Sequence, residues 1–125
     1  MILKLRVRVS NMYIRTEDGI YELVDELYFY HNGIEKFWYA KEENGATLAI
    51  EITADKILNK SENLYELCDA FVLIERNAKP IIFKTLRGAI NNKIYDDETI
   101  YGAIWTNKGL IYVAKVDNGG DFELI

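Results

Sequence analysis

The chain has 125 residues, of which half are hydrophobic and 28% are charged, and its formal net charge is −5. This composition excludes a disordered chain, and the length is sufficient to bury a core without disulfides or metal. The single cysteine, Cys68, excludes an internal disulfide and favours a reducing compartment. The acidic balance disfavours sequence-independent nucleic-acid binding, whose affinity comes mainly from neutralising phosphates, and is compatible with binding a basic protein surface.

The N-terminal segment alternates apolar and basic side chains over residues 3–9, a period of two that predicts one β-strand. Lys4, Arg6 and Arg8 then share one face of that strand. With Tyr13 nearby, they form a candidate surface for stacking and phosphate contacts with single-stranded nucleic acid. The favoured alternative is an edge strand that charge protects from pairing with other chains. These charges also exclude the apolar core of a signal peptide or a membrane span.

Tight turns punctuate the first half of the chain. Asn32 with Gly33, and Asn44 with Gly45, supply the positive φ angles that two-residue hairpin turns require. Asp18 and Gly19 mark a further turn. Strand-like runs occupy residues 21–30, 34–41 and 46–52. We therefore expect a curled antiparallel meander over residues 1–60.

Two-residue turns fix the pairing between these strands, so that Phe29 faces Lys36 and Trp38 faces Glu51. Directly opposed residues share a face of the sheet. One face is predicted to be the core and collects Tyr28, Tyr30, Phe37, Tyr39, Leu48, Ile50 and Ile52. The other face carries Leu27, Phe29, Ile34, Trp38, Ala40 and Ala49 among polar residues.

This second apolar face has two interpretations. Either the C-terminal half of the chain covers it, or it is a partner-binding patch in which an aromatic anchor dominates the affinity. In the second interpretation the candidate partner-binding residues are Leu27, Phe29, Lys36 and Trp38. The surrounding acidic residues would complement a basic target surface.

The second half of the chain, residues 61–125, predicts a mixture of strands and short helices. A helix is expected from a Ser61 cap to about Cys68, and a second one after a Thr85 cap, with Leu86, Ala89 and Ile90 on its buried side. Strands are expected over residues 70–75, 81–84 and 122–125, and a hairpin over residues 101–115 turns at Thr106–Gly109. The predicted fold class is α+β and β-rich, in which the meander packs on this second subdomain to form one domain overall.

The residues that could carry chemistry do not form a catalytic or metal-binding pattern. His31 precedes a hairpin turn, and Cys68 lies on the apolar side of a predicted helix beside Asp69. The acidic runs at residues 96–98 and 117–121 lack the ligand spacing of a calcium loop and are interpreted as solvated turns. There is no phosphate-binding glycine loop, nucleophile elbow or zinc spacing. The sequence predicts no enzymatic activity, no catalytic residue, no cofactor and no metal.

Two segments carry a resemblance to a known group of proteins. Residues 66–72 and 101–115, together with the ending at residues 119–125, resemble small proteins encoded in prophages and mobile elements of low-GC Gram-positive bacteria. The resemblance covers roughly the second half of the chain, and it implies no activity and no site residue. It does imply a bacterial cytoplasm, often beside accessory or counter-defence genes.

The function expected from the sequence is therefore that of a non-enzymatic phage or mobile-element accessory protein that binds a host protein with a basic surface. Inhibition of a defence nuclease, in the manner of an anti-CRISPR protein, is the specific form of this hypothesis. The alternative is a nucleic-acid or nucleotide-binding module that uses Lys4, Arg6, Arg8 and Tyr13. A third hypothesis is a symmetric homodimer that closes over the apolar face.

Overall fold

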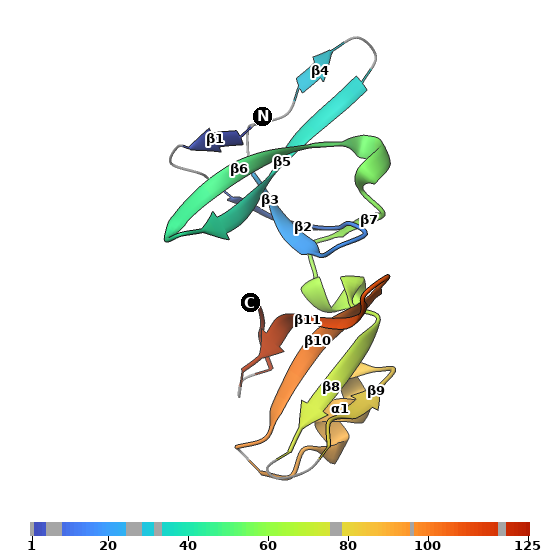
Figure 1. The fold of residues 1–125 in the computed structure, drawn as a ribbon. Helices are drawn as coiled ribbons and strands as arrows, with labels where there is room; N and C mark the ends of the chain where they lie inside the picture. The colour runs from blue at the N-terminus through green and yellow to red at the C-terminus, as the bar shows by residue number, and fades with distance from the viewer. Residues whose placement is uncertain are drawn as a thin grey trace. The chain divides into compact units, whose positions relative to one another are not determined.

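The computed structural model describes residues 2–4, 9–24, 29–31, 34–75, 79–95, 97–117 and 120–125. Within these ranges the fold is β-rich, with two antiparallel sheets, one α-helix and two 3-10 helices, so the predicted α+β class is confirmed (Figure 1). The chain divides into two compact units, unit 1 (Met1–Asn63) and unit 2 (Leu64–Ile125). The division falls three residues after the expected one because the last strand of unit 1 ends at Ser61.

Unit 1 contains one sheet of short and medium antiparallel strands. Its elements are β1 (Ile2–Lys4), β2 (Val9–Arg15), β3 (Ile20–Val24), β4 (Phe29–His31), β5 (Ile34–Glu43), β6 (Ala46–Thr53), the 3-10 helix η1 (Ala54–Lys56) and β7 (Asn59–Ser61). The strand order is β1-β6-β5-β3-β2-β7, and β4 pairs with β5. This arrangement is the expected meander with its two outermost strands added from distant parts of the sequence.

The predicted hairpin registers are confirmed. Phe29 pairs with Lys36 across β4 and β5, and Trp38 pairs with Glu51 across β5 and β6. The β5–β6 turn is closed by Asn44 at φ 51° and Gly45 at φ 78°. Both central residues have the positive φ of a type I′ turn, which is why this dipeptide predicts the register so well.

The prediction of one strand over residues 3–9 is wrong. Lys4 lies in β1 and pairs with Leu48 of β6, whereas Val9 begins β2 and pairs with Val24 of β3. Three strands separate β1 from β2 in the sheet order. The alternation was real, but two short strands at different places in the sheet have the same period as one long strand. The expected edge position is found for β1, which ends the order of the described strands.

The core of unit 1 lies on both faces of its sheet. Trp38, Val24 and Ala49 form a buried cluster against Ala40, on the face that was not predicted to be the core. On the predicted core face Ile52 is buried, but Phe37, Tyr39, Leu48 and Ile50 are only half-buried. The assignment of one core face was therefore wrong, because a curled sheet can bury apolar side chains on either side.

Unit 2 contains a second antiparallel sheet and the α-helix. Its elements are the 3-10 helix η2 (Leu64–Leu67), β8 (Ala70–Ile74), β9 (Ile81–Phe83), α1 (Leu86–Asn92), β10 (Thr99–Thr106), β11 (Gly109–Val116) and β12 (Phe122–Leu124). The strand order is β12-β11-β10-β8-β9, and α1 contacts β8 and β9. The predicted strands and the hairpin turn at Thr106–Gly109 are confirmed.

The two predicted helices differ in outcome. The Thr85 side chain accepts a hydrogen bond of 3.1 Å from the Gly88 N–H, so the predicted cap of α1 is confirmed. Ala89 is fully buried as expected, but Ile90 is 45% exposed. The first helix is only η2, which begins three residues after Ser61, because Ser61 completes the pairing of β7 with β2. No described helix is both long and apolar enough to cross a membrane.

Cys68 packs against the core cluster of unit 2, as expected for a structural cysteine. This contact explains Gly102 on β10. A Cβ atom at Gly102 would lie 2.7 Å from the Cys68 Sγ and 3.3 Å from the Phe122 ring. Both distances are below ordinary contact, so only glycine lets β10 approach Cys68 this closely.

We expect Gly102→Ala to lower the free energy of unfolding of unit 2 by about 1–3 kcal/mol, since it overpacks this contact. Urea denaturation measures the loss. In a Cys68→Ala background the same substitution is expected to cost less, because the opposing sulfur is gone. An equal cost in both backgrounds would contradict the contact.

Candidate functional site

The predicted partner-binding anchor Trp38 is not a surface residue. It is 4% exposed and belongs to the buried cluster of unit 1 with Val24 and Ala49. The Lys36 Nζ forms an ion pair of 2.8 Å with the Glu51 Oε1, and both side chains are half-buried. The interpretation of Trp38 as an exposed anchor is therefore corrected to that of a core residue.

The structure places Phe29 directly opposite Lys36, whereas it does not bring together the candidate nucleic-acid residues that it describes. Phe29 is placed in β4 by its backbone pairing with Lys36, and Leu27 lies outside the described residues. Arg6 and Arg8 also lie outside them. Lys4 and Tyr13 lie on β1 and β2, which three other strands separate in the sheet order.

Among the residues whose exposure the structure describes, the exposed apolar side chains lie mainly in unit 2. Among the described large hydrophobic residues ten are exposed, and nine of these belong to unit 2. Five of the nine lie on β9, on α1 or directly after it: Ile81, Ile82, Ile90, Ile94 and Tyr95. This group is called the β9–α1 edge below. Figure 1 shows α1 beside β9, which ends the order of the described strands in the unit 2 sheet.

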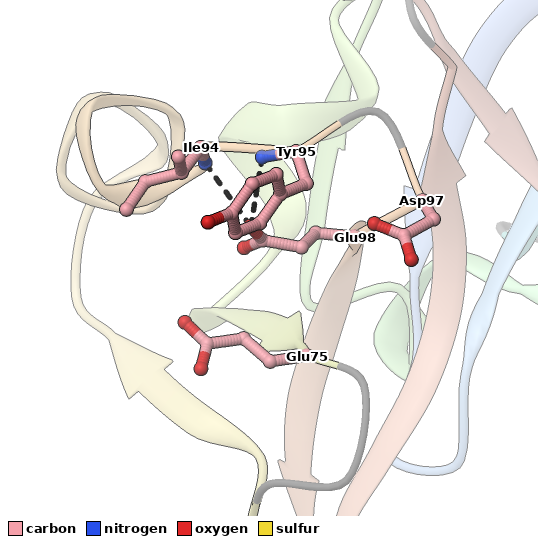
Figure 2. Close-up of a pocket in the computed structure, with 5 residues that line it drawn as sticks. All are labelled: Glu75, Ile94, Tyr95, Asp97 and Glu98. Carbon is pink, nitrogen blue, oxygen red and sulfur yellow. Dashed lines mark hydrogen bonds between the residues drawn. The ribbon is translucent and has the colours of Figure 1, made fainter.

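A cavity of about 360 Å³ opens beside the β9–α1 edge and shares two residues with it. Its lining consists of Glu75, Ile94, Tyr95, Asp97 and Glu98 (Figure 2). Glu75 follows β8, and the other four residues belong to the segment between α1 and β10. Three carboxyl groups and two largely exposed apolar side chains therefore line one cavity.

The Glu98 carboxylate organises the segment between α1 and β10. Its Oε1 accepts hydrogen bonds from the backbone N–H groups of Ile94, at 3.2 Å, and Tyr95, at 2.8 Å. The Glu98 N–H in turn donates to the Tyr95 carbonyl oxygen at 3.2 Å. Figure 2 shows these two hydrogen bonds as dashed lines to the Glu98 carboxylate, with Glu75 among the other residues that line the cavity. These contacts close a tight turn on one carboxylate oxygen.

The second carboxylate oxygen of Glu98, Oε2, differs from Oε1 in its hydrogen bonding. Glu98 is 5% exposed, and its buried Oε2 has no hydrogen-bond partner among the described residues. A buried carboxylate oxygen without a partner carries a desolvation cost that a donor would relieve. Among the described residues no lysine, arginine or histidine lines the cavity. The arrangement can therefore accept hydrogen bonds from a cationic or donor-rich group.

Sequence reasoning noticed this segment but interpreted it incorrectly. The acidic run at residues 96–98 was interpreted as a solvated turn, whereas Glu98 is buried. A usable signal was the period of the following strand. Glu98, Ile100 and Gly102 are spaced by two, and Ile100 and Gly102 are buried. The run contained one inward-facing carboxylate that composition alone does not reveal.

A second cavity of about 420 Å³ lies within unit 1, between the turn after β2 and the end of β6. It is lined by Thr16, Glu17, Asp18, Tyr39, Glu51, Ile52, Asp55, Lys56 and Leu58. The rings of Tyr39 and Tyr21 are in contact, with centroids 4.3 Å apart. Hydrogen bonds from Lys36 and Thr53 lower the pKa values of Glu51 and Asp55 respectively. The carboxylates of Asp18, Glu51 and Asp55 therefore already have partners in the chain, unlike the Glu98 Oε2.

Three tyrosines of unit 1 are expected to ionise at a higher pH than free tyrosine. Burial, together with the negative charge of Asp18, raises the pKa of Tyr21 to about 12, and burial also raises the pKa values of Tyr13 and Tyr39. Well below the ordinary tyrosine pKa of 10.0 these residues are neutral in both the folded and the unfolded chain. Between about pH 10 and 12 the unfolded chain loses protons that the native state retains, so the stability of unit 1 falls as the pH rises.

The ultraviolet absorbance of tyrosinate measures this behaviour. We expect a late step above the ordinary tyrosine value of 10.0, and Tyr21→Phe is expected to diminish it. A single step that contains all nine tyrosines would contradict the burial of this group.

Comparisons of this chain with protein-family models, with curated proteins and with solved structures found no match. The class of molecule defined by the fold is thus a β-rich α+β protein with two units. Its candidate site is the acidic cavity beside the β9–α1 edge.

Proposed function

We propose that this chain is a non-enzymatic binding protein that engages a basic protein surface through the β9–α1 edge of unit 2. The observation that carries this proposal is the group of five exposed apolar side chains of the β9–α1 edge, two of which line a cavity with three carboxyl groups. Exposed apolar side chains beside polar groups are typical of protein interaction sites. Their acidic surroundings complement a positively charged partner.

The partner that we propose is a host protein that binds nucleic acid, in particular a defence nuclease. Such proteins carry a basic patch as the electrostatic footprint of their nucleic-acid site. A compact acidic protein with a net charge of −5 can compete for that patch. The resemblance to prophage and mobile-element proteins supports this target class. Inhibition would then follow from occupation of the phosphate-binding surface, without any catalytic step by the chain itself.

A capture experiment with matched variants tests the proposal. The tagged chain is incubated with a nuclease-treated lysate of a low-GC Gram-positive bacterium, and the captured protein is quantified. Ile94→Ser is the test variant, because Ile94 is 77% exposed and lies at the proposed interface. Leu58→Ser is the control, because Leu58 is 59% exposed but lies in unit 1. We expect capture to weaken roughly tenfold or more with Ile94→Ser and to be unchanged with Leu58→Ser.

Other results would redirect the proposal. Equal capture by both variants would exclude the β9–α1 edge as the interface. Co-purification of nucleic acid that is lost steeply with salt would favour the alternative module based on Lys4, Arg6, Arg8 and Tyr13. Light scattering at several concentrations would identify a homodimer as the occupant of the edge instead.

A further inference from the structure

We propose that the cavity formed by Glu75, Ile94, Tyr95, Asp97 and Glu98 is a recognition pocket for an arginine side chain of the partner protein. The inference rests on the proposed function and deepens it by naming the group that unit 2 recognises. The cavity combines the apolar side chain of Ile94, the carboxylates of Glu75 and Asp97, and the buried Glu98 Oε2, which has no partner among the described residues. A guanidinium group on an aliphatic stem has the complementary set of properties.

The buried oxygen of Glu98 is the first part of the argument. Its neighbour Oε1 is committed to the backbone N–H groups of Ile94 and Tyr95, so the carboxylate cannot turn away without breaking both hydrogen bonds. The Oε2 is therefore held in place, buried and without a partner among the described residues. An N–H donor that reaches it gains a charge-assisted hydrogen bond at a position that is already organised.

Tyr95 is the second part of the argument. It lines the same cavity as Glu98, and its side chain is 66% exposed (Figure 2). An exposed side chain changes rotamer on a fast timescale, so the ring can move when a group enters the cavity. The ring can then stack on the planar guanidinium and cover it from water. Ile94, which is 77% exposed, offers apolar contact to the methylene stem.

The placement of the carboxylates favours a guanidinium over a metal ion. In the described part of the chain no group of three or more acidic, histidine or cysteine side chains is close enough to hold a metal. The carboxylates of Glu75, Asp97 and Glu98 line one cavity without converging on a point. Guanidinium spreads five N–H donors over a rigid plane and can contact separated acceptors, whereas a lysine ammonium is a compact charge.

Amide chemical shifts of the full-length chain test this inference with small probes. The ¹⁵N-labelled protein is titrated with the N-acetyl N-methylamides of arginine, lysine and citrulline, the last being the neutral isostere of arginine. We expect arginine to shift the amide signals of Ile94 and Tyr95, which donate to Glu98, with a dissociation constant in the millimolar range. We expect lysine to bind more weakly and citrulline to produce no saturable shift.

Two substitutions test whether the arginine probe binds at Glu98. Glu98→Gln preserves the shape and one acceptor for the two backbone N–H groups but removes the charge, and we expect it to weaken arginine binding about tenfold. Glu123→Gln removes the same charge from an exposed position of β12 outside the cavity, and we expect no change. Retained amide signals across unit 2 establish that the Glu98→Gln protein is folded.

Several results would overturn the inference. Absence of an arginine shift, an equal effect of citrulline, an equal affinity for lysine, or undiminished binding by Glu98→Gln would each do so. Arg76, which lies outside the described residues, is tested with Arg76→Gln. If only that variant binds the probe, the cavity belongs to the chain's own arginine and not to a partner. Because these probes need no partner protein, their result is independent of the capture experiment.

Discussion

Replacement of Trp38 by alanine is expected to lower the free energy of unfolding of unit 1 by about 3–5 kcal/mol, the usual cost of deleting a buried tryptophan. Trp38 is 4% exposed and packs with Val24 and Ala49, so the truncated side chain leaves a cavity that the sheet cannot fill. Urea denaturation followed by the amide signals of unit 1 measures the loss.

Trp105→Ala is the matched control for this prediction. Trp105 is the second of the two tryptophans and is 55% exposed, so its loss is expected to cost less than about 1 kcal/mol. If both substitutions prove equally mild, Trp38 is not a core residue and the exposed-patch interpretation returns. The comparison matters for function, because any loss of partner binding by Trp38→Ala is expected to follow from unfolding.

Leu73→Ala is expected to destabilise unit 2 by about 2–5 kcal/mol. Leu73 is fully buried on β8 in a cluster with Phe71, Ala89, Ile100 and Val116. Ile82→Ala is a suitable control, since Ile82 is 54% exposed on the neighbouring strand β9. Amide signals of unit 2 report the transition, and a Leu73→Ala protein as stable as the control would contradict the assigned core.

Together the Trp38 and Leu73 substitutions address the domain organisation. Each one weakens the core of one unit, so the signals of the other unit report how far the two unfold together. The expectation of one domain overall requires that both units lose stability in both variants. Separate transitions would show that the units are independent folding domains.

Local chemistry explains why the hairpins could be predicted. Asn44 and Gly45 both adopt positive φ, and few other residue pairs do so without strain, so the sequence determined the register of β5 and β6. The cap of α1 was predictable for a similar reason, because the Thr85 hydroxyl oxygen has one local donor to satisfy. The Asn44–Gly45 turn and the Thr85 cap both depend on residues that are close together in the sequence, which is why they could be predicted.

Tertiary packing explains the failures. The alternation of residues 3–9 could not reveal that Lys4 and Val9 pair with different strands, because a period of two contains no information about the partner. The sequence also did not determine which face of the meander carries the buried cluster around Trp38, because apolar residues occupy both faces. Glu98 was missed for a different reason. The acidic run suggests a solvated turn by its composition, whereas the spacing of two from Glu98 to the buried Ile100 indicates an inward-facing side chain.

The short strand β9 has a consequence for how the chain can expose an apolar edge without polymerising. A strand at the edge of a sheet is a template on which another copy can add a strand. β9 ends the order of the described strands and carries the exposed apolar side chains of Ile81 and Ile82. However, β9 has only three residues, and Pro80 directly before it lacks an N–H to extend the ladder. A second copy that adds a strand here would find only a short ladder with no N–H at Pro80, which disfavours fibril-like growth.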